Sequence, residues 1–331
     1  MNSMTNKKWT ISLAVLFFLF LYVLIQFVVS TQKIEKTVEQ LRQTVRSSPA
    51  LPHFVLISQE FDNLYWREVE RGAKEAAKHY HVNVEYIGPL RTNLDEQMKL
   101  LEKAIASRVD GIIVQSLNDV RFTPLINKAM AQGIPVITID TDAPLSRRLS
   151  YVGTNNLEAG KLLGQAVISR VNGKKKIGVI IGSDMSANQN LRLEGFRSVI
   201  AQNPSLSIAA IASSNISRIQ ASIQTEKMLR AHPDISVMVG TSALDAIGIL
   251  MATKNLNRKD VQIFGFDNVT ETLQAIRQGQ IVATIIQQPY DMGYSAVELM
   301  VKHLSGQHIE KEHFTAIKIV DKTNVQQEGT E

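Results

Sequence analysis

Carboxylate, hydroxyl and amide side chains stand at the ends of several apolar runs in this 331-residue chain. The run PVITID ends at Asp140, and the run VQIFGFD ends at Asp267. Thr241 and Ser242 follow the run ISVMVG, and Gln287 follows IVATII. Ionised carboxylates accept hydroxyl protons in charge-assisted hydrogen bonds, whereas amides both donate and accept. If these groups share one site, they suit a neutral ligand that carries many hydroxyl groups.

The strand-end aspartates also have a purely structural interpretation. Asp140 and Asp267 could each cap the amino end of a helix, because aspartate is favoured where a strand and a loop lead into a helix. Asp142 and Asp245 are better explained as caps or solvated residues than as ligand contacts. The sequence alone therefore leaves two roles open for Asp140 and Asp267.

Other candidate residues are ambiguous in the same way. Tyr65 and Trp66 follow the first apolar run, HFVLIS, and an aromatic face can cover the C–H side of a sugar ring. Adjacent helical residues point in different directions, so at least one of the two could pack in a core instead. Asn190 could cap a helix, and only one of Gln287 and Gln288 can face a cavity if the strand pleat continues.

The elements that would position these residues alternate regularly from His53 onward. Nine short apolar runs are separated by amphipathic stretches such as LDEQMKLLEKAIASR, a pattern typical of parallel sheets covered by helices on both faces. So many strands, in about 270 residues, favour two similar α/β lobes over one sheet. In open parallel sheets, ligands bind outside the carboxyl ends of strands, which is where the polar residues stand.

Composition and motifs exclude several other functions. The chain has no cysteine, which rules out disulfides, thiol catalysis and a cysteine-linked lipid anchor. Its net charge of +5 is spread along the sequence, unlike the concentrated basic face of a nucleic-acid-binding protein. Phosphate-binding, dinucleotide-binding and zinc-protease motifs are missing, so no cofactor or metal is expected. An enzyme is the weaker class, and its best version uses Asp140 and Asp267 as a glycosidase carboxylate pair.

The amino-terminal region predicts a membrane anchor. Residues 11–29 form a 19-residue apolar stretch, long enough to cross a bilayer, with residues 1–10 as a cytoplasmic tail. A cleaved signal peptide is the alternative, but its apolar region would be shorter and its best cleavage site, before Thr31, is a poor one. Basic residues lie on both sides of the stretch, so the fold argument, rather than charge, places the large domain outside the cell.

A helical linker is predicted between this anchor and the domain, over residues 30–50. Ile34, Val38, Leu41 and Val45 form a stripe at helical spacing. The stripe spans two heptads, which fits a spacer helix and also a short coiled coil. Pro49 and Pro52 then end the linker.

Residues 53–321 resemble the type I periplasmic sugar-binding proteins of the ribose and galactose group. The resemblance rests on FDNLYWREVERGAKEAA, GIPVITIDTDAP, RLEGF, AHPDISVMVGTSALDAIGIL, VQIFGFDN and GQIVATIIQQPYDMG. It implies two lobes joined by three crossovers, with residues 53–154 plus 288–315 in the N-terminal lobe and residues 155–287 plus 316–323 in the C-terminal lobe. Residues 324–331 would form a tail. Closure of the lobes around the ligand would be the functional motion.

The same resemblance implies which residues bind the ligand. They are Tyr65, Trp66, Asp140, Asn190, Ser242, Asp267 and Gln287, and Asn63 and Thr141 are further candidates beside them. Thr141 and Asn190 stand where ribose-binding members carry arginines, and the loss of two guanidinium groups changes which hydroxyls can be held.

The sequence thus predicts a membrane-tethered, extracytoplasmic binding protein for a small neutral sugar or polyol, and no enzyme. A proteinaceous anchor with a helical linker favours signalling to a membrane sensor histidine kinase. Delivery of the sugar to an ABC permease is the alternative, since both functions use the same closure.

Overall fold

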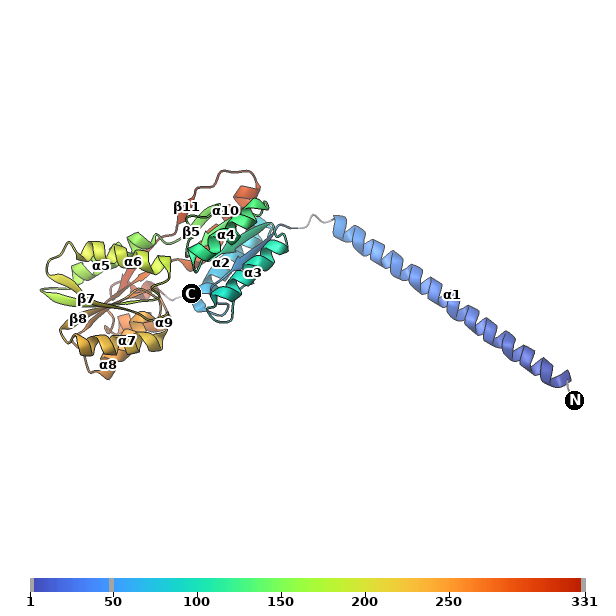
Figure 1. Cartoon of the computed structure of the whole chain (residues 1–331), viewed down its shortest axis with the longest axis horizontal. Coiled ribbons are helices and arrows are strands. Elements are labelled where there is room, and N and C mark those ends of the chain that lie inside the picture. Colours follow the sequence, from blue (N-terminus) through green and yellow to red (C-terminus); the bar gives the residue numbers. More distant parts are fainter. Residues whose placement is uncertain (1–2, 48–50, 329–331) are drawn as a thin grey trace. The chain divides into compact units, whose positions relative to one another are not determined.

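The computed structural model divides into two compact units, residues 1–51 and 52–331, of which it describes residues 3–47 and 51–328. Figure 1 shows the first unit as a single long helix and the second as two α/β lobes. The predicted fold of two such lobes is confirmed.

The first unit is one continuous helix, α1 (Ser3–Ser47). Its stretch Val15–Val38 is long and apolar enough to cross a membrane, and its side chains are exposed. Ile34 and Val38 of the predicted stripe lie on this helix, whereas the side chains of the later stripe positions and Pro49 lie outside the described residues. The anchor and most of the linker therefore share a single helical element.

The N-terminal lobe contains a six-stranded parallel sheet in the order β11-β5-β4-β3-β1-β2. Its strands are β1 (His53–Ile57), β2 (Asn83–Ile87), β3 (Gly111–Val114), β4 (Val136–Ile139), β5 (Ser150–Gly153) and β11 (Glu312–Phe314). Alternate residues of β1 pack into the cores on opposite faces of the sheet. Because both faces are covered, the central strands are apolar throughout. One face is covered by α2 (Leu64–Tyr80) and α10 (Pro289–Leu304), and the other by α3 (Leu94–Ala106) and α4 (Asp119–Ala131).

The C-terminal lobe repeats this design with the order β12-β10-β9-β8-β6-β7. Its strands are β6 (Lys175–Ile181), β7 (Leu206–Ser213), β8 (Ile235–Gly240), β9 (Gln262–Phe266), β10 (Ala283–Ile286) and β12 (Lys318–Asp321). Helices α5 (Asn156–Arg170) and α6 (Ala187–Ile200) cover one face, and α7 (Arg218–Ala231), α8 (Asp245–Asn255) and α9 (Thr270–Arg277) cover the other. The short helix η1 (Val325–Gln327) follows β12.

The chain passes between the two sheets three times. It crosses from β5 to α5, from β10 to α10, and from β11 to β12. All nine strands expected from the apolar runs are present, but β5, β11 and β12 were not predicted. In addition, β12 is antiparallel to β10, so the second sheet is mixed rather than purely parallel.

Two glycines allow helices to approach closely beside these crossovers. A Cβ atom on Gly72 of α2 would lie 2.0 Å from the carbonyl oxygen of Tyr290 on α10. A Cβ atom on Gly160 of α5 would lie 2.0 Å from the carbonyl oxygen of Arg192 on α6. Because only glycine fits, each helix pair packs backbone to backbone. The second pair brings Arg192 beside the amino end of α5.

Candidate functional site

A cavity lies between the two lobes, at the carboxyl ends of their strands. Its free volume is about 80 Å³. The N-terminal lobe contributes Gln59, Asn63, Tyr65, Trp66, Gln115 and Asp140. The C-terminal lobe contributes Ser186, Asn188, Gln189, Arg192, Ile216, Ser242, Ala243, Asp267 and Gln287.

Asp140 directs its carboxylate into this cavity from the end of β4. Its backbone is left-handed, with φ of 61°, and the next residue donates its N–H back to Ile139 at 2.7 Å. Oδ1 accepts a hydrogen bond from the Tyr65 hydroxyl at 2.8 Å, and Oδ2 accepts one from Gln115 Nε2 at 2.7 Å. These partners come from other elements and β4 leads to β5, so Asp140 is not a helix cap.

Asp267 occupies the corresponding position in the other lobe. Its φ is 65°, its N–H donates to Ile285, and its Oδ1 accepts from Gln287 Nε2 at 2.8 Å. Burial raises the pKa of Asp267 to about 6, while the Arg192 guanidinium acts in the opposite direction and Asp140 adds to the rise. Two carboxylates, one from each lobe, therefore face the same space.

Arg192 is the cationic residue of the cavity lining and was not predicted. Its side chain is fully buried, and it donates to Asn156 Oδ1 at 2.8 Å, to the Thr241 carbonyl oxygen at 3.0 Å and to Gln287 Oε1 at 2.9 Å. Its guanidinium carbon also lies 3.9 Å from the ring centre of Phe266. These partners hold the charge in place and leave the guanidinium little freedom to follow a ligand.

Asn190 is not brought to the cavity, although the resemblance placed it there. It lies two residues before Arg192 on α6, which turns it to the exposed side of the helix. Its amide donates to the carbonyl oxygen of Asp184 at 2.9 Å. Arg192, two residues further along α6, brings a guanidinium to the cavity lining instead.

The aromatic pair lines the cavity, and both rings also contribute to the core. Trp66 is only 3% exposed, and the two rings meet edge to face at 5.6 Å. Burial raises the pKa of Tyr65 well above its ordinary value, with further rises from Asp140 and Asp267, so its hydroxyl stays a donor. Asn63 caps α2 by accepting the Tyr65 N–H at 3.0 Å and also lines the cavity.

Thr141 stands behind the cavity rather than in its lining. It is 1% exposed, and its hydroxyl donates to Asp140 Oδ2 at 3.0 Å, so it supports the carboxylate. Ser242 does line the cavity, and its hydroxyl and Gln115 Oε1 are buried without a hydrogen-bond partner. A buried polar atom without a partner costs about 1–3 kcal/mol, which a ligand hydroxyl would remove.

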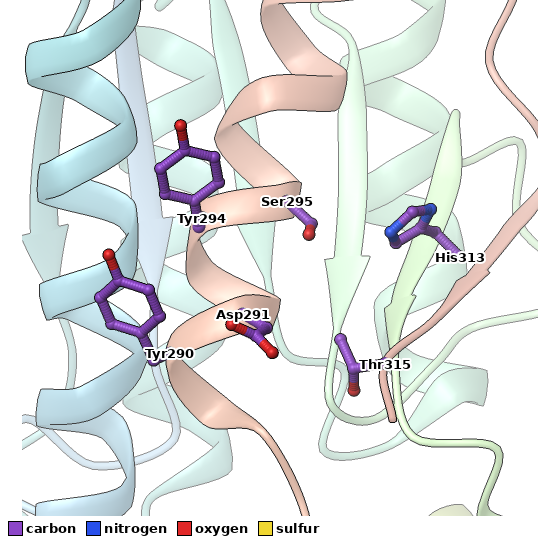
Figure 2. Close-up of a pocket in the computed structure, with 6 residues that line it drawn as sticks. All are labelled: Tyr290, Asp291, Tyr294, Ser295, His313 and Thr315. Carbon is purple, nitrogen blue, oxygen red and sulfur yellow. The ribbon is translucent and has the colours of Figure 1, made fainter. Parts of the chain in front are cut away.

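A second hollow lies on the surface of the N-terminal lobe, beside α10 and β11. Figure 2 shows Tyr290 and Tyr294 on the side of α10 that faces α2, with Asp291 and Ser295 directed toward His313 and Thr315. All these residues belong to one lobe, so lobe closure would not change the hollow. Within the described residues, no group of three or more metal-ligating side chains is present. The cavity between the lobes is therefore the candidate site.

The charge state of Asp267 predicts how ligand affinity depends on pH. Above its pKa of about 6 the carboxylate is ionised and can accept a ligand hydroxyl. Below that pH it binds a proton, so affinity should fall by up to about tenfold per pH unit. Asp140, Tyr65 and Arg192 are the other titratable groups that face the Asp267 carboxylate. Isothermal titration with sugar from pH 7.5 to 5 would measure the change in affinity. Asp267→Asn should remove most of this slope, and equal affinity at pH 7 and 5 in the parent would contradict the prediction.

Comparison with known proteins defines the class. The family model of the periplasmic binding protein domain matches residues 54–308. The structure is similar to that of GanP, a glucose-galactose binding protein from Geobacillus stearothermophilus, with 44% identity and a TM-score of 0.81 over 84% of this chain and 99% of that one. It is also similar to a chain of the XylFII-LytSN complex, with 35% identity and a TM-score of 0.78 over 83% of this chain and 99% of that one.

Among curated proteins, the D-ribose/D-allose-binding protein of Pseudomonas aeruginosa is 24% identical over 275 residues, which is 80% of this chain and 86% of the relative. The chain belongs to the periplasmic binding protein family. Within it, the two-lobed fold and the relatives place the chain among the type I sugar-binding proteins, a group of binding proteins rather than enzymes.

Proposed function

We propose that the cavity binds a neutral monosaccharide, with the aldohexoses D-glucose and D-galactose as the first candidates. The observation that carries this proposal is the convergence of Asp140 and Asp267, from separate lobes, on one cavity. Arg192 uses three of its five N–H donors on protein groups, and the lining sets this one cation against the two carboxylates of Asp140 and Asp267. This set disfavours an acidic sugar. The 44% identity to a glucose-galactose binding protein supports the choice of hexoses.

Binding would shift the protein toward a closed form. A ligand stabilises closure only if it makes better contacts there, and a hexose that bonds to both aspartates satisfies this condition. The three crossovers are the segments that would bend, because each lobe is held internally by its own sheet and close helix pairs. Two of these crossovers are joined by a hydrogen bond, which Thr154 Oγ1 donates to Gln287 Oε1 at 2.7 Å. The same Gln287 oxygen also accepts the bond from Arg192.

The closed protein would signal to a membrane sensor histidine kinase. The continuous helix α1 supports a permanent tether with the binding domain outside the cell, since an uncleaved helix keeps the protein beside a partner in the same membrane. A relative with 35% identity was solved as part of a complex with a second protein, LytSN. Residues 1–10 would then face the cytoplasm.

Sugar import is the second candidate function. It is favoured by curated relatives that are import proteins, such as the ribose import binding protein of Escherichia coli, 27% identical over 197 residues. In that case a permease, rather than a kinase, would bind the closed form.

Isothermal titration of residues 52–331 with pentoses, hexoses and polyols tests the ligand. We expect an aldohexose to bind with micromolar affinity or better and galacturonate to bind far more weakly. Preferential binding of the acidic sugar would overturn the proposed ligand class, and turnover of a glycoside would support an enzyme.

The location of the protein after expression separates the two partners. We expect the full chain in the membrane fraction with its original amino terminus, and a mature terminus at Thr31 would favour import. Affinity purification of the tethered protein with and without sugar should recover a histidine kinase only with sugar. Recovery of a permease instead would reject signalling.

A further inference from the structure

The loop after β7 has an unusual backbone beside the cavity. Asn215 and Ile216 are both left-handed, with φ of 51° and 54°. Asparagine tolerates this region, but a β-branched residue there is a true outlier. Ile216 also lines the cavity, as an apolar wall contributed by the C-terminal lobe. A strained conformation persists only where surrounding contacts fix it.

Several hydrogen bonds fix this loop. The Ser214 N–H donates to Ile181 at 2.9 Å, and the Ile216 N–H donates to Gly182 at 2.8 Å. The Ser214 hydroxyl donates to Asp245 Oδ1 at 2.6 Å, and both of these residues are fully buried. The side-chain bond is thus made where water does not compete.

The same carboxylate fixes a second loop of the cavity wall. Asp245 Oδ2 accepts the Ser242 N–H at 2.8 Å and the Thr241 N–H at 3.2 Å. Ser242 lines the cavity, and its hydroxyl is buried without a partner. Asp245 itself does not line the cavity. One buried carboxylate therefore joins the loop that carries Ile216 to the loop that carries Ser242.

We propose that Asp245 is a positioning residue: through Ser214 and the Ser242 backbone it fixes Ile216 and Ser242 against the ligand. This inference rests on the proposed sugar-binding function, and it identifies a determinant of affinity behind the site. Ile216 would contact an apolar face of the ring, while the free Ser242 hydroxyl would bond to a ligand hydroxyl.

A simpler role for Asp245 is to cap α8. Asp245 is the first residue of α8, and its carboxylate accepts the N–H groups of Thr241 and Ser242 in the turn that leads into this helix. Capping accounts for the bond from Ser242 but not for the bond from Ser214, which belongs to another loop. A cap alone would affect stability and leave ligand affinity unchanged.

Ser214→Ala separates these roles. It removes the hydroxyl that bonds to Asp245 and that also accepts the Ile216 N–H at 3.2 Å, and it keeps the bonds from Thr241 and Ser242 to Asp245. We expect the full-length protein in detergent to bind D-glucose or D-galactose about tenfold more weakly after this change, the factor that follows from one lost buried hydrogen bond. Ser116→Ala is the matched control, since Ser116 is equally buried and its hydroxyl has no partner among the described residues.

A double-mutant comparison shows whether the effect passes through Ile216. Glycine adopts the left-handed region freely, so Ile216→Gly should itself weaken binding and make the loop independent of Ser214. Ser214→Ala in that background should then change affinity less than twofold. A tenfold loss in both backgrounds would overturn the link to Ile216.

A measurement without sugar keeps the inference separate from the proposed function. Amide hydrogen exchange over residues 214–217 should become faster in Ser214→Ala and stay unchanged in Ser116→Ala. A parent protein that binds neither sugar would reject the hexose assignment alone. If the unmutated protein binds sugar and Ser214→Ala has the same sugar affinity or the same amide exchange rate, the proposed role of Asp245 is wrong.

Discussion

Replacing Asp140 with alanine should weaken sugar binding by at least about a hundredfold. The carboxylate would accept ligand hydroxyls in charge-assisted bonds, each of which is worth about 1.5–3 kcal/mol, and a single change removes all of them. The change also removes the shortest bond of the Tyr65 hydroxyl and of Gln115 Nε2, which keep contacts of 3.2–3.3 Å to Met292 Sδ, Gln59 Oε1 and Thr141 Oγ1. Isothermal titration with D-glucose and D-galactose would measure the loss.

Two variants control for indirect effects of this change. Asp140→Asn keeps the shape of the side chain and should remain folded while it binds weakly. Asp184→Ala removes an exposed carboxylate that does not line the cavity, so its affinity should equal that of the parent. If Asp140→Ala and the parent bound sugar equally, the cavity between the lobes would not be the binding site.

Trp66→Ala should cost the binding domain about 3–5 kcal/mol in free energy of unfolding, the usual loss for a buried large aromatic residue. Trp66 is 3% exposed and belongs to the core formed by α2, α10 and the first sheet, where Val69 and Met292 are also buried. Its ring also lines the cavity, so sugar affinity should fall as well. Urea unfolding followed by circular dichroism would give the stability change.

The conservative variant Trp66→Phe distinguishes the two roles of this ring. It should recover most of the stability because it fills part of the same space, and it should keep an aromatic face toward the ligand. A Trp66→Ala protein as stable as the parent would show that the ring does not contribute to the core.

The strand-end residues of the site could be predicted because the sheet positions them. Asp140, Asp267 and Gln287 directly follow apolar strands, and the carboxyl ends of parallel strands meet at one edge. Ser242 could be found in the same way, two residues after β8. Here the covalent order of the chain is enough to bring the residues together.

Residues that depend on helix rotation or loop conformation could not be predicted. The resemblance placed Asn190 at the site, and the polar stretch before Phe196 has no apolar period that would fix the rotation of α6 and point to Arg192 instead. The available signal was an arginine two positions away, in a chain with two strand-end carboxylates. Ile216 and the support from Asp245 depend on a left-handed loop, which local propensity disfavours.

The fold was more predictable than the site because apolar periodicity specifies buried strands. The three strands that were missed, SYVG, EHF and KIVD, contain at most two apolar side chains each, and β11 is exposed along its whole length. They form because the crossovers bring them to neighbouring strands, and this depends on tertiary structure rather than on their own residues.

The chain enters the binding domain at His53, the amino end of β1, whereas the ligand cavity lies at the carboxyl end of that strand. Helix α1 is thus covalently joined to the N-terminal lobe alone, and the chain reaches the C-terminal lobe only through the crossovers. In a tethered protein the N-terminal lobe would stay fixed relative to the membrane, and the C-terminal lobe would rotate toward it when a sugar binds. A receptor that touches both halves would register occupancy as a change in their spacing, with no movement of the anchor.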